Sequence, residues 1–163
     1  MQYGFNSPSR GYFKGDRLLE EITGYFQADP QRSYLLAVGT DSRQLVDRSS
    51  FVTVIAVHRR GCGGRYYWHQ FYRRRFEALR PRIQVEAELS LKIVTELTRE
   101  LEPRLEQLPD LPEFELEVHV DIGKNGPTGK MINEIAGMIS GCGYELKTKP
   151  HAYCAAVLAD NHA

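Results

Sequence analysis

Cysteine is scarce in this sequence. The 163 residues contain only three cysteines, Cys62, Cys142 and Cys154, at wide spacings and without a C-x-x-C pair. An odd number of distant thiols excludes a small disulfide scaffold and argues against a zinc cage. A chain of this length buries roughly 70% of its unfolded surface when it folds, so one packed core needs neither kind of cross-link.

Long hydrophobic runs and net charge are lacking as well. No stretch approaches the roughly 18 uninterrupted apolar residues of a membrane-spanning helix, and the N-terminal sequence MQYGFNSPSR lacks the apolar run of a signal peptide. We therefore expect no membrane partner and a cytoplasmic location. The 21 basic and 21 acidic residues balance, and 42% of the residues are hydrophobic, which is typical of a globular domain. We predict a single domain over 1–163, with an irregular N-terminal arm over 1–15.

The charge is unevenly distributed along the chain. The segment 59–82 holds eight arginines and one acid, whereas the segment 86–121 holds eleven acids and three bases. Two solvated surfaces would explain both runs. The arginines are also interleaved with aromatic residues, and such a surface attracts phosphates and stacks bases. These aromatic residues are Tyr66, Tyr67, Trp68, Phe71 and Tyr72. The pattern alone leaves both interpretations open.

Hydrophobic periodicity and turn residues predict alternating helices and strands. The helices are expected over 16–28, with Asp16 as the N-cap, over 85–105, from about 128 to 141, and after Pro150. The strands are expected over 33–41, 51–58, 65–72, 114–121 and 144–149.

The order of these elements predicts an α/β fold. The segment 51–72 is typical of an antiparallel hairpin, and strands joined through helices need right-handed crossovers, so they tend to lie parallel. We therefore predict a mixed five-stranded sheet, in which three antiparallel strands precede the parallel ones, with helices on both faces. In such sheets the functional crevice lies at the carboxyl ends of the central strands. Asp41 and Asp121 are expected there.

Four acids of this fold are candidates for one site. Asp41 and Asp121 end two neighbouring buried strands, Glu88 lies in the first turns of the long helix, and Asp160 lies in the last helix. Facing carboxylates repel and raise each other's pKa, so their proximity is destabilising unless a cation or a shared proton offsets it. Carboxylate oxygens are the ligands that Mg²⁺ or Mn²⁺ prefers.

This arrangement resembles the ribonuclease H-like pattern, in which four acids hold two catalytic metal ions. Three motifs resemble, more narrowly, those of the YkuK family of small bacterial ribonuclease H-like proteins. They are G-T-D-S (39–42), V-D-I-G-K-N-G-P-T (120–128) and K-P-H-A-Y-C-A-A-V-L-A-D-N-H (149–162). The resemblance covers nearly the whole chain. It implies a sheet with the third strand at one edge and the first in the middle, but no particular activity.

Carried over by position, the resemblance implies a set of metal-binding and catalytic acids. This set is Asp41, Glu88, Asp121 and Asp160. Glu86 is the alternative to Glu88, which we prefer because it lies closer to the expected apolar stripe of the helix. Val85, Leu89 and Ile93 mark that stripe. Where the family pattern leads us to expect a polar amide after G-T-D-S, this chain has Arg43.

The predicted function is that of a metal-dependent nuclease or phosphodiesterase that acts on RNA, DNA or a hybrid by a two-metal mechanism. Two ions would clamp the scissile phosphate, one activating the attacking water and the other neutralising the leaving oxygen. The predicted substrate-binding residues are Lys124, Asn125, Arg73 and Arg74. His162 lies two positions after Asp160, where it is either a proton shuttle or a mobile tail residue.

Other functions fit the sequence less well. The segment 123–131 places five residues rather than four between its glycines, and Met131 follows Lys130, so it is not a P-loop and we expect no nucleoside triphosphate. Cys154 lies three residues from His151 but within an apolar run, which favours a packed thiol over a nucleophile. The main alternative is a non-catalytic module that binds nucleic acid or another partner on the same scaffold.

Overall fold

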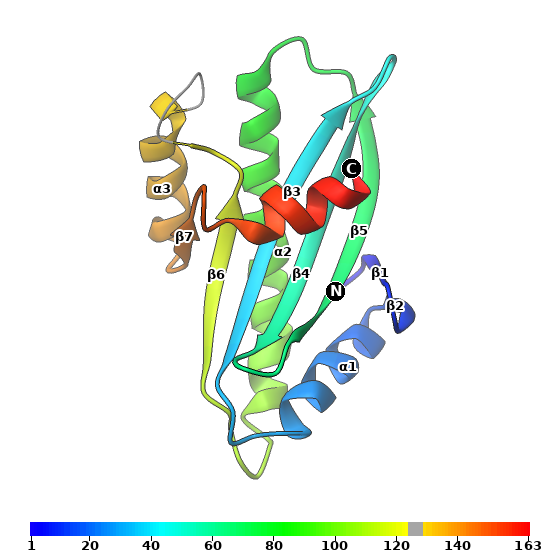
Figure 1. Ribbon diagram of the computed structural model, residues 1–163, viewed down its shortest axis with the longest axis vertical. Coiled ribbons are helices and arrows are strands. Elements are labelled where there is room, and N and C mark those ends of the chain that lie inside the picture. The colour runs from blue at the N-terminus through cyan, green and yellow to red at the C-terminus, as the bar shows by residue number, and fades with distance from the viewer. Residues whose placement is uncertain (124–128) are drawn as a thin grey trace.

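Residues 1–123 and 129–163, which a computed structural model describes, contain seven strands that form one sheet. The strands are β1 (Gly4–Ser7), β2 (Gly11–Lys14), β3 (Tyr34–Gln44), β4 (Arg48–Arg59), β5 (Gly64–Arg74), β6 (Phe114–Val120) and β7 (Glu145–Lys147). Their order across the sheet is β2-β1-β5-β4-β3-β6-β7. Figure 1 shows β3 and β4 side by side in its middle.

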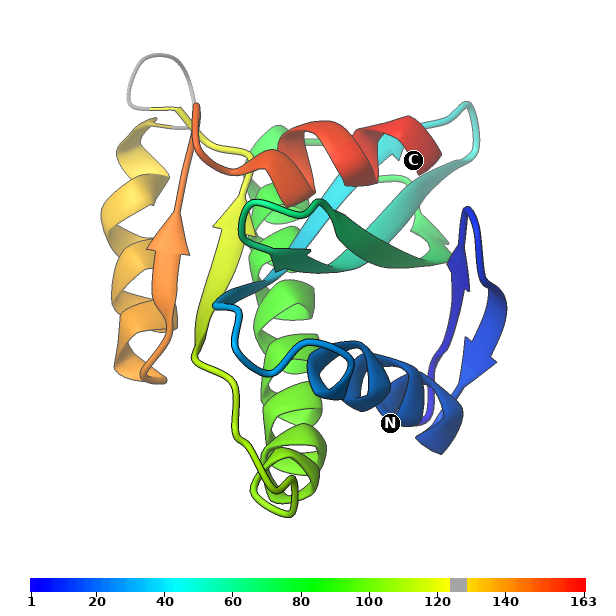
Figure 2. The same ribbon diagram turned by 60° about the horizontal axis from the view of Figure 1, so that its bottom comes forward.

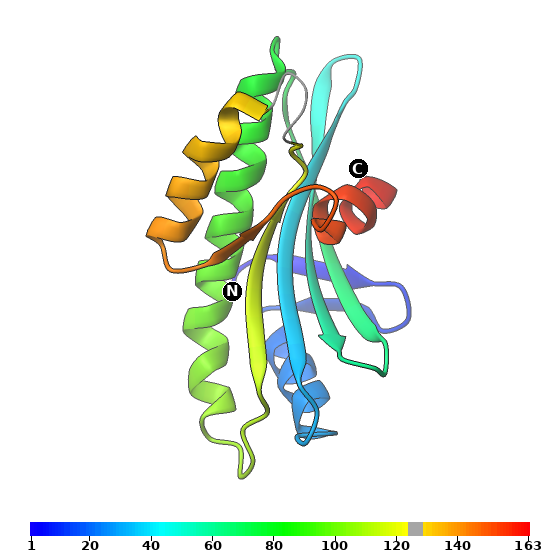
Figure 3. The ribbon, with the colours of Figure 1, turned by 60° about the vertical axis from the view of Figure 1, so that its left-hand side comes forward.

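Helices cover both faces of this sheet. They are α1 (Asp16–Gln27), α2 (Leu79–Leu105), η1 (Gly129–Met131), α3 (Ile132–Gly141), the π-helical η2 (Cys154–Ala159) and the 3₁₀ turn η3 (Asp160–His162). Figure 3 shows α2 and α3 on one side and the C-terminal segment, residues 154–162, on the other. Within the described ranges, no helix combines the length and the apolarity needed to cross a membrane.

The strand pairing confirms the predicted mixed sheet. β3, β4 and β5 pair antiparallel in sequence order, and β6 and β7 extend the sheet on the other side of β3 as parallel strands. The first predicted strand, β3, therefore lies in the middle, as the family resemblance implied. The described part of the chain has two strands more than the five expected, because the N-terminal residues contribute a hairpin.

The N-terminal arm is not irregular, which corrects the sequence-based expectation. β1 and β2 pair antiparallel, and β1 reaches β5 through the pair Asn6 and Trp68. Phe5 is fully buried, and the carbonyl of Gly4 lies 2.8 Å from Nδ1 of His69. β5 is therefore not an edge strand. Strands of four residues that begin with glycine are too short for hydrophobic periodicity to indicate them.

The larger core lies between the sheet and the helices α1 and α2. The buried stripe of α2 contains Ile83, Glu86, Ala87, Ser90, Ile93, Val94, Leu97, Leu101 and Leu105. The long helix is confirmed, although it begins at Leu79 rather than at 85. α1 also begins at the predicted residue, but Gly15, with φ of +56°, occupies the N-cap position. Asp16 instead accepts a hydrogen bond from Arg104 at 2.7 Å.

The C-terminal segment covers the opposite face of the sheet (Figure 2). Cys154 and Ala159 of the segment form a smaller apolar cluster with Ala37, Val52, Val54 and Ala56 of the sheet. The segment approaches β3 closely at Gly39, where a Cβ atom would lie 2.8 Å from the backbone nitrogen of Ala155. The predicted closing helix is therefore present, and it crosses the sheet face on which odd-numbered residues of β3 lie.

Candidate active site

Three carboxylates line one pocket of about 240 Å³ beside the end of β6. They belong to Asp41 of β3, Glu86 of α2 and Asp121, which directly follows β6. The other lining residues are Leu79, Arg82, Ile83, Gly123 and Lys149. Sheet and helix thus bring together acids that are up to 80 positions apart in the chain.

The pocket forms because β6 ends before β3 does. β3 pairs with β6 up to Thr40 opposite Val120, and it then continues to Gln44 in its hairpin with β4. After β6 the chain turns away, with the amide of Ile122 donating to the carbonyl of Val120 at 2.9 Å. The prediction that Asp41 ends its strand is therefore wrong, because β3 continues to Gln44. Asp41 is the first residue of β3 without a parallel neighbour.

Glu86, rather than Glu88, is the acid that α2 places in the pocket. Its side chain is only 3% exposed, and it accepts a hydrogen bond from the hydroxyl of Ser42. Burial raises the pKa of Glu86 to about 8, and the negative charges of Asp41 and Asp121 add to this rise. The hydrogen bond from Ser42 and the guanidinium of Arg82 oppose it.

From the sequence we preferred Glu88, but Glu88 does not line the pocket. Glu88 is exposed and accepts a hydrogen bond from the amide of Gln84 at 3.0 Å. Side chains two positions apart on a helix point in directions that differ by about 200°, so burying Glu86 turns Glu88 to solvent. The apolar stripe that we expected through Val85 and Leu89 is rotated away from the face of α2 that is buried. Ala87 and Ser90 mark the face that packs on β3.

Asp41 is a partly buried carboxylate among other acids. Burial is the main reason that its pKa rises to about 6, and the charges of Asp121 and Asp160 contribute. The backbone amide of Ser42 and the charge of Arg82 act in the opposite direction. Folding therefore disfavours the charged forms of both Asp41 and Glu86.

Asp121 has one carboxylate oxygen without a hydrogen-bond donor. Lys149 Nζ lies 3.0 Å from Oδ1 of Asp121, but the orientation is that of an ion pair rather than a hydrogen bond. Among residues 1–123 and 129–163, no group donates a hydrogen bond to this buried oxygen. Lys149 follows β7, whose parallel alignment with β6 brings the ends of both strands to one edge of the sheet. That rule could have identified Lys149 from the sequence.

Asp160 lies near the pocket but does not line it. Its side chain is 58% exposed and forms an ion pair with Arg43, whose Nη2 is 3.5 Å from Oδ1. Asp160 is still close enough to raise the pKa of Asp41. Arg43, found where an amide was expected, is therefore the partner of the fourth predicted acid.

These acids are not already arranged as a metal coordination shell. In the part of the chain that the structure describes, no three His, Cys, Asp or Glu side chains are placed to hold one ion. Arg43 and Lys149 instead form ion pairs with Asp160 and Asp121. The donor chemistry nevertheless fits a divalent cation. The acids of the pocket offer only oxygen ligands. The pKa values of Asp41 and Glu86 are raised, and Oδ1 of Asp121 lacks a hydrogen-bond donor.

The predicted substrate-binding residues are only partly described. Lys124 and Asn125 lie outside the described residues. Arg73 and Arg74 are exposed at the end of β5, and neither forms an ion pair within the described ranges. As neighbours in a strand they project from opposite faces of the sheet.

His162 is packed rather than mobile. Its ring stacks on Trp68 with the ring centroids 3.9 Å apart, and its Nε2 lies 3.3 Å from the hydroxyl of Tyr66. Partial burial lowers the pKa of His162. This stacking holds the end of the C-terminal segment on β5.

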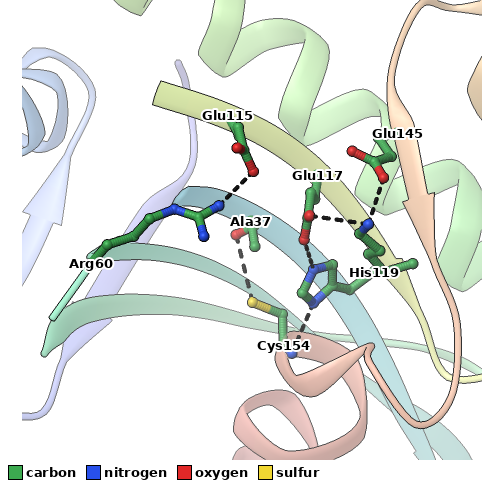
Figure 4. Close-up of polar contacts among 8 residues, drawn as sticks. Ala37, Arg60, Glu115, Glu117, His119, Glu145 and Cys154 are labelled. Atoms are coloured by element: carbon green, nitrogen blue, oxygen red, sulfur yellow. Dashed lines mark hydrogen bonds and ion pairs between the residues drawn. The ribbon is translucent and has the colours of Figure 1, made fainter. Parts of the chain in front are cut away.

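A buried histidine fixes the start of the same segment (Figure 4). The backbone amide of Cys154 donates to Nδ1 of His119 at 3.2 Å, so Nε2 carries the proton and donates to Glu117 at 2.9 Å. The thiol of Cys154 points to the carbonyl of Ala37, and burial raises its pKa. This packed environment agrees with the prediction of a structural thiol and argues against a nucleophile.

The chain is similar to known proteins over most of its length. Residues 17–163 match the family model described as ribonuclease H-like. The chain is 33% identical over 150 residues to the uncharacterized protein YkuK of Bacillus subtilis (strain 168), a similarity that covers 85% of this chain and 84% of YkuK. No solved structure matches the chain. The resemblance seen in the acid motifs is therefore confirmed.

Proposed function

The chain belongs to the ribonuclease H-like family, and from this premise we propose that it is a metal-dependent nuclease or phosphodiesterase acting on nucleic acid. The proposed site is the pocket of Asp41, Glu86 and Asp121, with Asp160 beside it. The observation that carries this proposal is the placement of Asp41 and Glu86 in one pocket, with the pKa of each carboxyl raised.

A purely structural role gives no reason for this arrangement. Charged carboxylates that are buried near one another lower the free energy of unfolding unless a cation offsets their repulsion. Lys149 pairs with Asp121 at the pocket and Arg82 contributes positive charge, yet the pKa of Glu86 is still about 8. A divalent cation is the ligand that would remove most of the remaining repulsion.

Asp41, Glu86 and Asp121 are the residues that would hold Mg²⁺ or Mn²⁺, and Asp160 would join them after leaving Arg43. Glu86 here takes the role that the sequence pattern assigned to Glu88. A divalent ion in this pocket would supply Lewis-acid stabilisation of a phosphate and an activated water, and two ions would serve the attacking and the leaving oxygen.

The cationic residues of the pocket have a separate role in this proposal. Arg82 is held in place because its Nη1 donates to the carbonyl of Ser42 at 3.0 Å. Lys149 has a half-exposed side chain that can reach a phosphate as well as Asp121. We assign both to binding and orienting the phosphate beside the acids, together with Lys124 and Asn125, which follow β6 in the sequence.

Two measurements test this function. Calorimetric titration with Mn²⁺ should show binding that Asp41→Asn weakens strongly. Labelled single-stranded, duplex and hybrid oligonucleotides should be cleaved with Mn²⁺ or Mg²⁺ and not with EDTA. A chain that neither binds Mn²⁺ nor cleaves any of these substrates would exclude the proposed activity.

A non-catalytic nucleic-acid-binding module is the second candidate. The ion pairs of Arg43 and Lys149 with Asp160 and Asp121 favour it, because they neutralise two acids without a metal. In that case oligonucleotides would bind in EDTA with a strong dependence on salt. They would remain intact when Mn²⁺ is added.

A further inference from the structure

An exposed cationic surface adjoins Asp41 on the same face of the sheet. In the strand register, Asp41 lies opposite Val52, and Val52 lies opposite Gln70. The next row that shares this face consists of Arg43, Ser50 and Tyr72, and the row beyond contains Arg48 and Arg74. Because side chains alternate along strands, these rows project to one side.

This side is the face that the C-terminal segment covers. Val52 belongs to the apolar cluster beneath the segment, and the amide of Gln70 donates to the carbonyl of His162 at 3.1 Å. Tyr72 is 50% exposed, and Arg48 and Arg74 are exposed as well. We call Arg48, Tyr72 and Arg74 the cationic platform.

The platform keeps positive charges together without a strong acidic partner. Arg48 and Arg74 lie directly opposite each other in the register, an arrangement in which like charges repel. Asp47 is 3.9 Å from Arg48, but it is highly exposed, and such solvated pairs contribute little. Elsewhere in the described ranges, no carboxylate pairs with Arg74. A polyanion would offset this repulsion.

The platform also offers a stacking surface. The guanidinium carbon of Arg48 lies 4.4 Å from the centroid of the Tyr72 ring. This contact pre-orients a planar cation above an aromatic ring on an open sheet face. Unpaired bases stack on aromatic rings and guanidinium planes, whereas the bases of a duplex expose only their edges in the grooves. The combination favours a single strand over a duplex.

We propose that the cationic platform binds a single-stranded segment of nucleic acid, with phosphates at Arg48 and Arg74 and an unpaired base against the pair of Arg48 and Tyr72. Tyr72 lies in the row of Arg43, and Arg48 and Arg74 lie in the next row, so the platform directs such a strand toward the pocket of Asp41. The inference deepens the proposed function, on which the direction of the strand depends. Binding to the platform itself requires no metal and no cleavage.

The sequence predicted both Arg73 and Arg74 as substrate-binding residues, but only Arg74 belongs to the platform, so Arg73 provides a matched control. Both are exposed arginines of β5, but Arg73 lies on the opposite face, where its guanidinium carbon is 5.8 Å from the centroid of the Phe71 ring. Removing either side chain changes the net charge equally. A general electrostatic attraction would be weakened to a similar degree by both substitutions, whereas binding to the platform depends on Arg74 and not on Arg73.

The test measures the anisotropy of fluorescently labelled oligo(U) and oligo(dT), and of a duplex of equal length, in EDTA. Tyr72→Ala should weaken binding of the single strands at least about fivefold, because a stacking surface for a base is lost. Arg74→Ala should weaken it by a similar factor, because a phosphate contact is lost. Arg73→Ala should stay within twofold of the wild type. Tyr72→Phe, which keeps the ring, should restore most of the affinity.

Equal losses in Arg73→Ala and Arg74→Ala, an unchanged affinity in Tyr72→Ala, or a duplex bound as tightly as the single strands would each overturn the platform. Thermal melting of every variant separates lost binding from lost folding. Cleavage is assayed separately with Mn²⁺. If the wild type binds as expected but cleaves nothing, the nuclease proposal fails and the platform stands. If the wild type cleaves but the platform variants bind the single strands as tightly as the wild type, the platform fails and the nuclease proposal stands.

Discussion

Lys149 Nζ lies 3.0 Å from Oδ1 of Asp121, at the pocket that three carboxylates line. An ammonium in this position neutralises an acid that the proposed function assigns to a divalent cation. Lysine and metal would then compete for the same oxygen. The protein without metal is thus stabilised by a residue that a bound ion would have to displace.

Lys149→Met should therefore increase the affinity for Mn²⁺, by about fivefold if the ion pair contributes on the order of 1 kcal/mol. Calorimetric titration in the absence of nucleic acid measures this change. Lys147→Met is the control, because Lys147 pairs with Glu145 and Glu117 outside the pocket. Affinity that is unchanged or reduced in Lys149→Met would show that the lysine does not compete with the ion. Cleavage should decrease in the same variant, since a phosphate contact is lost.

Glu86 should make stability depend on pH. Its pKa in the folded protein, about 8, lies above its ordinary value of 4.5, so its contribution to stability is fully present at low pH and is lost as the pH rises through about 8. In EDTA, the melting temperature of the wild type should therefore fall between pH 5 and pH 9. Glu86→Gln should reduce this fall and should melt several degrees higher than the wild type at pH 9.

The matched variant is Glu88→Gln, which removes an exposed acid of the same helix and should leave the pH profile unchanged. Adding Mn²⁺ at pH 9 should raise the melting temperature of the wild type and not that of Glu86→Gln. If Glu86→Gln melts below the wild type at pH 9 in EDTA, burial of Glu86 is not the source of the pH dependence.

Most of the fold could be predicted because its long elements have clear periods. α2 repeats apolar residues at helical spacing, and β4 and β5 flank an obvious turn, so element type and pairing follow from local physics. The N-terminal hairpin could not be predicted in this way. Its strands have four residues each, and they are held by tertiary contacts such as the buried Phe5 rather than by an alternating pattern.

The sequence could predict which acids belong to the candidate site better than it could predict how their side chains are oriented and paired. Asp41 and Asp121 follow from the rule that sheet crevices lie at strand ends, and both line the pocket. The choice between Glu86 and Glu88 depends on the rotational phase of α2, which apolar residues alone define poorly because Ala87 and Ser90 also face the sheet. The pairing of Asp160 with Arg43 is a contact between distant segments, which one sequence does not reveal.

Asp121→Asn should abolish cleavage while leaving the fold intact. The substitution removes the charge of a carboxylate oxygen that lacks a donor in the described part of the chain, and it keeps the shape of the side chain. Single-turnover cleavage of a labelled oligonucleotide with Mn²⁺ measures activity, and circular dichroism measures folding. Asp110→Asn changes an exposed acid in the loop before β6 and should cleave at the wild-type rate. Undiminished cleavage by Asp121→Asn would remove Asp121 from the mechanism.

Gly39→Ala should loosen the C-terminal segment. A Cβ at this position would lie 2.8 Å from the backbone nitrogen of Ala155 and 3.0 Å from the carbonyl oxygen of His119, and neither backbone atom can move without shifting the segment. We expect a loss of about 1–3 kcal/mol in the free energy of unfolding. Denaturant unfolding measures this loss, and limited proteolysis measures release of the C-terminus. The same glycine-to-alanine change at Gly24, which has open space inside α1, should instead stabilise the protein by about 0.5–1 kcal/mol. If Gly39→Ala is as stable as Gly24→Ala, the segment is not held against β3 as closely as the structure indicates.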